Sequence, residues 1–120
     1  MPNLMPTDIR PQVEAVLRNA QVNTGGRSYL TAYQILEQLP QQIKDRLIAE
    51  RGSPGLGSGT YYAAANVVSD AAEMISGIEI AFLDTSSLKI ILKNVTDITP
   101  GNRNVGLYRL QILIANEALH

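Results

Sequence analysis

The chain of 120 residues contains no cysteine, no tryptophan and a single histidine, His120, which is its last residue. Without cysteine there can be no disulfide, thiol nucleophile, iron–sulfur cluster or cysteine-ligated zinc. A histidine at a chain end is expected to fray, so it cannot hold the general base of a Ser-His-Asp arrangement in register. No apolar run approaches the ~18 residues that span a bilayer, and no signal-peptide pattern opens the chain. We therefore expect a cytoplasmic protein with no membrane partner.

Charge of either sign is also sparse, because ten Lys and Arg stand against eleven Asp and Glu and the formal net charge is −1. Hydrophobic residues make up 45% of the chain, which is enough for one buried core without a structural metal. We expect a single domain over residues 1–120, with a frayed N-terminus at residues 1–6 and a flexible glycine-rich loop at residues 52–59.

Helical patterns fill the first part of the chain. Apolar residues recur on one helical face between Thr7 and Ala20, and Thr7 is the expected N-cap. Thr31 and Gln34 have the spacing of a capping box, which predicts a helix that starts at Thr31. Pro40 breaks that helix and can open the next one, which ends at Gly52.

A fourth helix is predicted from Thr60, with Gly77 as its C-terminal stop. Its apolar stripe comprises Tyr61, Ala64, Val67, Val68, Ala71, Met74 and Ile75. Alternating residues then predict a hairpin of strands 78–83 and 88–95 and a third strand over 105–114, and the connector 27–30 can add a one-residue strand. N-terminal helices followed by a three-stranded antiparallel sheet define an α+β fold.

Helix, short connector, helix pair, helix and hairpin is an order that resembles the winged helix-turn-helix superfamily, over roughly residues 8–110. Leu30–Leu36 resembles the second helix of that superfamily, Thr60–Ile75 its recognition helix, Ile78–Val95 its wing and Leu107–Leu110 its closing strand. The resemblance implies a recognition helix that enters the major groove and offers polar side chains to base edges.

The charge pattern departs from that expectation, because no Lys or Arg occurs between Gly52 and Leu88 while four carboxylates do. Such a segment would repel phosphate. A DNA-binding transcriptional regulator remains one hypothesis, with arginines as phosphate contacts and two polar residues of the fourth helix as base readers. The candidate DNA contacts are Arg27, Arg51, Asn66, Ser69, Arg103 and Arg109.

Gly55–Thr60 runs into a predicted helix N-terminus and could present backbone N–H groups to an anion, which makes a small-ligand protein a further hypothesis. The segment lacks the lysine of a P-loop and follows a predicted helix instead of a strand, so a linker explains it better. Asp70 and Glu73 lie three apart, as in a cation site, but also as on any hydrated helix face. We expect no enzyme, no cofactor and no metal site.

Tyrosines account for five of the six aromatic residues, and the predicted strand 105–114 is apolar on both faces. If the helices lie on one side of the sheet, its other face is left to bind a second copy. Alternatively, this segment is a central strand that is sandwiched within the monomer. Our first hypothesis is a non-enzymatic, winged-helix-like interaction domain that forms a homo-oligomer, with a dimer favoured. The candidate interaction residues are Tyr61, Tyr62, Leu107, Tyr108, Leu110, Ile112 and Ile114.

Overall fold

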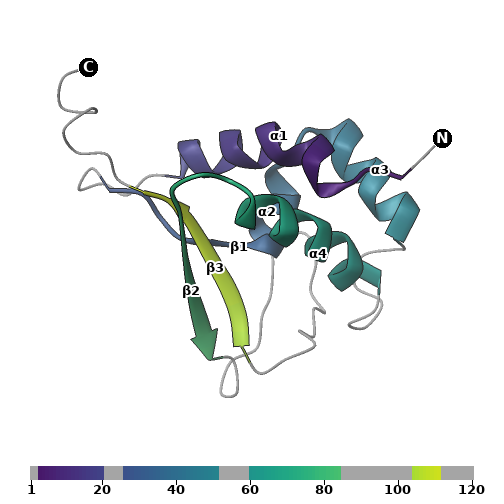
Figure 1. Cartoon of the computed structure of the whole chain (residues 1–120). Helices are drawn as coiled ribbons and strands as arrows, with labels where there is room; N and C mark the ends of the chain where they lie inside the picture. The colour runs from purple at the N-terminus through teal and green to yellow at the C-terminus, as the bar shows by residue number, and fades with distance from the viewer. Residues whose placement is uncertain (1–2, 21–25, 52–59, 85–103, 112–120) are drawn as a thin grey trace.

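The computed structural model describes residues 3–20, 26–51, 60–84 and 104–111, without the side chains of residues 51, 60–63 and 104. Its elements, in chain order, are α1 (Pro6–Asn19), β1 (Leu30–Thr31), α2 (Ala32–Gln38), α3 (Gln41–Arg51), α4 (Thr60–Glu73), β2 (Ile78–Asp84) and β3 (Asn104–Leu110) (Figure 1). The predicted α+β class is confirmed, with helices first and strands mostly after them. The predicted strand 88–95, the glycine-rich loop 52–59 and residues 112–114 lie outside the described residues.

The start of α1 differs from the prediction, because Met5 and not Thr7 is the N-cap. The Asp8 carboxylate accepts a hydrogen bond of 2.8 Å from the Met5 backbone N–H, so it satisfies a donor at the helix entrance. Pro6 occupies the first helical position, where its missing N–H costs nothing. Thr7 therefore lies inside the first turn, where its side chain is exposed.

The capping box of α2 is confirmed. Thr31 Oγ1 accepts a hydrogen bond of 3.1 Å from the Gln34 backbone N–H, and Gln34 Oε1 accepts one of 2.8 Å from the Thr31 N–H. Pro40 separates α2 from α3, and its carbonyl accepts hydrogen bonds of 3.0 Å from the N–H groups of both Ile43 and Lys44. Local chemistry thus sets the ends of these two helices.

We expect Thr31→Ala to lower the free energy of unfolding by about 1 kcal/mol, because the Gln34 N–H loses its acceptor in a half-buried site. Thr7→Ala is the matched control, since Thr7 is exposed and does not cap α1. Its effect should stay within about 0.5 kcal/mol. Urea unfolding followed by circular dichroism measures both variants, and equal losses from the two would contradict the assignment of the caps.

The sheet is antiparallel with strand order β1-β3-β2, so β3 is its central strand. The central position that the alternative interpretation gives this strand is confirmed for residues 104–110 by the strand order. Gly77 has a positive φ of 79°, which favours glycine, and it turns the chain from α4 into β2. The Gln111 N–H donates a hydrogen bond of 3.0 Å to the Gly77 carbonyl, which continues the β2–β3 register by one pair.

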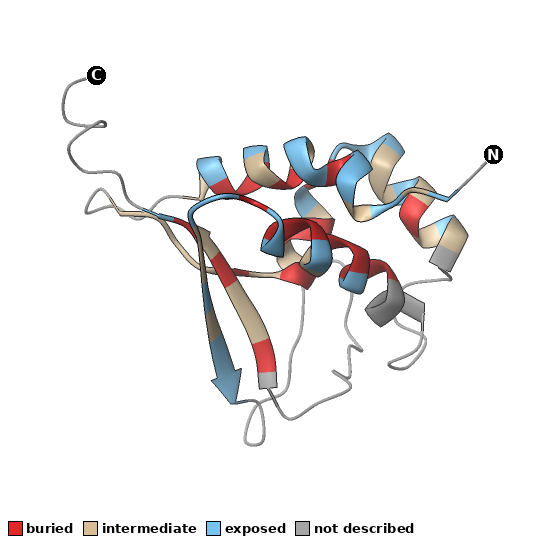
Figure 2. Ribbon diagram, viewed as in Figure 1, coloured by how far each residue is buried: buried red, intermediate tan, exposed pale blue. Residues whose placement is uncertain are grey.

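The hydrophobic core lies where α1, α2 and α4 meet one face of the sheet (Figure 2). The largest fully buried side chains are Ile9, Val13, Leu17, Ile35, Leu36, Leu47 and Val68. The predicted stripe of α4 is buried at Ala64, Val67, Val68, Ala71 and Ile75. Met74 is the exception, with 45% of its surface exposed.

Candidate interaction surface

Alternation along the strands assigns each residue to one of two faces of the sheet. Leu30, Tyr108 and Leu110 share the face that packs against the helices, and all three are buried. The Tyr108 hydroxyl is hydrogen-bonded to the Ser69 hydroxyl of α4, which ties β3 to that helix. Tyr108 and Leu110 were predicted to contact a second copy, but the structure places both in the core of the monomer. The apolar side chains of β3 that lie on the helix-bearing face are covered by the chain's own helices.

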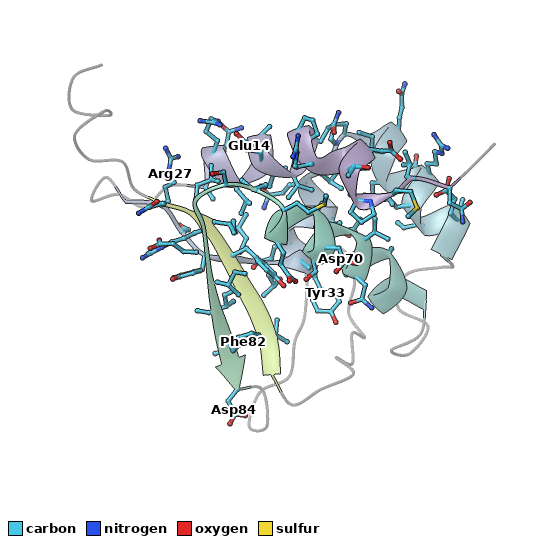
Figure 3. The ribbon with its side chains drawn as sticks, viewed as in Figure 1. Glu14, Arg27, Tyr33, Asp70, Phe82 and Asp84 are labelled. Carbon is cyan, nitrogen blue, oxygen red and sulfur yellow. The ribbon has the colours of Figure 1, made fainter. Side chains whose placement is uncertain are left out.

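The exposed apolar side chains belong to β2. Phe82 is 74% exposed and Ile80 is 44% exposed, on the same face of the sheet as Tyr108, and Leu83 is 39% exposed on the opposite face. We call Ile80 and Phe82 the β2 patch. Figure 3 shows Phe82 near the end of β2, beyond the helices, and Figure 2 shows that end of the strand as exposed. The helices cover only the first part of β2, where Ile78 packs against the core.

Sequence reasoning missed the β2 patch. The alternation of Ile78, Ile80 and Phe82 correctly indicates that their side chains share one face of a strand. Alternation of this kind is typical of a half-buried strand. How far along the strand the helices reach is not encoded in the alternation. The only sequence signal was Phe82 itself, the single phenylalanine of the chain.

The opposite face of the sheet carries a cluster around Arg109. Its Nε donates a hydrogen bond of 2.6 Å to Glu79 Oε1 across the β2–β3 pair. Its guanidinium carbon lies 4.4 Å from the centroid of the Tyr29 ring, a cation–π distance. The hydrogen bond to Glu79 raises the pKa of Arg109 above its ordinary value. Because Glu79 balances its charge, Arg109 is better placed to stiffen the sheet than to hold a phosphate.

The other described candidates for DNA contacts do not gather on one surface. Arg27 donates a hydrogen bond of 2.8 Å to the carbonyl of Arg18, in the last turn of α1. Asn66 is exposed on α4, but its face of the helix also carries Asp70 and Glu73. Ser69 is hydrogen-bonded both to Tyr108 and to Glu73. Within the described parts of the chain, α4 therefore presents an acidic face and not a cationic one.

The remaining candidate site residues are either half-buried or outside the described residues. Leu107 is half-buried on the face that carries Arg109. The Tyr61, Tyr62 and Arg51 side chains, together with Arg103, Ile112 and Ile114, lie outside the described residues. Among the residues that are described, no group of three His, Cys, Asp or Glu could hold a metal ion.

Comparisons with protein-family models, with curated proteins and with solved structures found no match for this chain. The helices in the described ranges include none that is both long and apolar enough to cross a membrane. The class that the fold itself defines is α+β, and the feature that distinguishes its described surface is the β2 patch.

Proposed function

We propose that this protein is a non-enzymatic interaction domain, winged-helix-like in its order of elements, that self-associates through the β2 patch. The observation that carries the proposal is the 74% exposure of Phe82 beside the exposed Ile80. Large apolar side chains that adjoin one another on a surface favour burial against a partner, since each removes apolar area from water. Isolated exposed residues such as Met5 would not support the same argument.

The sequence of β2 supports the proposal further. Sheets commonly protect an edge strand with lysine, proline or a bulge, and Ile78–Asp84 contains neither lysine nor proline. The register with β3 is continuous over all seven residues of the strand. Among the described residues, β3 is also the one strand that pairs with β2. A regular and mostly apolar strand with neither lysine nor proline is suited to receive another strand at its outer edge.

We expect the sedimentation coefficient of the wild-type protein to rise with concentration across the micromolar range. Phe82→Ser should abolish this rise, because it removes the most exposed apolar side chain of the patch. Met5→Ser is the matched control: Met5 is 55% exposed, but it lies at the start of α1 and away from β2 (Figure 1). A wild-type protein that stays monomeric at every concentration would contradict the proposed function.

A further inference from the structure

The backbone of β2 shows which of its groups point away from β3. In an antiparallel ladder, pairs that exchange hydrogen bonds alternate with pairs that do not. The bond from the Gln111 N–H to the Gly77 carbonyl marks the pair of residues 77 and 111 as hydrogen-bonded. Two steps along, the pairs Glu79 with Arg109 and Ala81 with Leu107 are of the same kind. The backbone N–H and C=O groups of Ile80 and Phe82 therefore point outward from the sheet.

We infer that the occupant of this outer edge is β2 of a second copy, paired antiparallel about a two-fold axis at Ala81. This inference rests on the proposed self-association and specifies its geometry. Ile80 then lies opposite Phe82 of the partner subunit, and the two residues exchange backbone hydrogen bonds. The pair occurs twice across the axis, so each exposed side chain of one copy contacts a cross-strand neighbour of the other copy on the helix-bearing face of the sheet.

Charge favours the antiparallel direction. The charged residues of β2 are Glu79 and Asp84, both acidic. A parallel pairing in register would set each carboxylate opposite its own copy, which is unfavourable. In the antiparallel register about Ala81, Glu79 lies opposite Leu83 of the partner subunit and Asp84 lies opposite the partner's Ile78. The acidic groups thus face apolar residues.

Strand length and helix position favour Ala81 as the centre. Ala81 is the middle residue of the seven in β2, so a two-fold axis at Ala81 pairs the whole strand. An axis at Ile80 or Phe82 would leave residues at one end of each strand unpaired. The helices cover β2 at Ile78 and leave Phe82 exposed. Because the strands run in opposite directions, the helical layers of the two copies lie over opposite ends of the joined strands. A single short strand gives a small interface, so we expect a reversible dimer.

A cysteine introduced at the axis tests this geometry, and the chain has no other cysteine to interfere. In the proposed register Ala81 and Ala81 of the partner subunit form a non-hydrogen-bonded pair with Cα atoms about 4.5 Å apart, within reach of a disulfide. We expect mild oxidation of Ala81→Cys to give a disulfide-linked dimer in several-fold higher yield than oxidation of Leu83→Cys. An equimolar mixture of Glu79→Cys and Leu83→Cys should instead give the mixed dimer.

The outcomes separate the two proposals. A monomeric wild-type protein in sedimentation would remove the proposed function and this inference together. A concentration-dependent wild-type dimer with equal yields from Ala81→Cys and Leu83→Cys would overturn only the register at β2. Circular dichroism of the reduced variants verifies that each one folds.

Discussion

Leu17→Ala should lower the free energy of unfolding by about 2–5 kcal/mol. Leu17 is 0% exposed on α1, the helix that packs against α4 and contacts β3. Alanine loses the transfer free energy of three buried carbon atoms and leaves a cavity that rigid neighbours fill only in part. Urea unfolding at a concentration where the protein is monomeric measures the loss.

Phe82→Ala is the control for that measurement. It removes a larger apolar side chain than Leu17→Ala does, but from a position that is 74% exposed. In the monomer its effect should stay within about 1 kcal/mol, since little buried area is lost. A loss from Phe82→Ala as large as that from Leu17→Ala would mean that the end of β2 is covered within the monomer.

Gly106→Ala should lower the free energy of unfolding by about 1–3 kcal/mol. A Cβ atom at residue 106 would lie 2.7 Å from the Tyr108 hydroxyl oxygen and 3.1 Å from the ring carbon that bears it. The Tyr108 ring cannot easily retreat, because it is 5% exposed and its hydroxyl is bonded to Ser69. Glycine at position 106 thus makes room for the side chain that joins β3 to α4.

A double-mutant cycle with Tyr108→Phe isolates this contact. Phenylalanine lacks the hydroxyl that the new Cβ would meet, so Gly106→Ala should cost less in the Tyr108→Phe background than in the wild type. The coupling free energy expected for residues in direct contact is about 0.5–3 kcal/mol. Purely additive losses, measured by urea unfolding of all four proteins, would indicate that Gly106 matters for some reason other than Tyr108.

The position of the candidate surface followed from the fold and not from the choice of apolar residues. Sequence reasoning selected Tyr108 and Leu110 because their strand is apolar on both faces, and it included no residue of β2 among the candidate interaction residues. With β3 between β1 and β2, Tyr108 came under α4, while Phe82 came to lie beyond the helices.

What the sequence by itself determined is local. Three features depend only on residues within four positions of one another: the capping box of Thr31 and Gln34, the break at Pro40 and the turn at Gly77. Such features can be predicted from the sequence. The pairing of Leu30 with Tyr108 joins residues 78 positions apart, and the Ser69–Tyr108 bond joins residues 39 apart. Such contacts are selected by how all the apolar faces are buried at once, which no local pattern specifies. Only the tertiary structure could therefore decide that β3 is central and that β2 keeps an exposed apolar end.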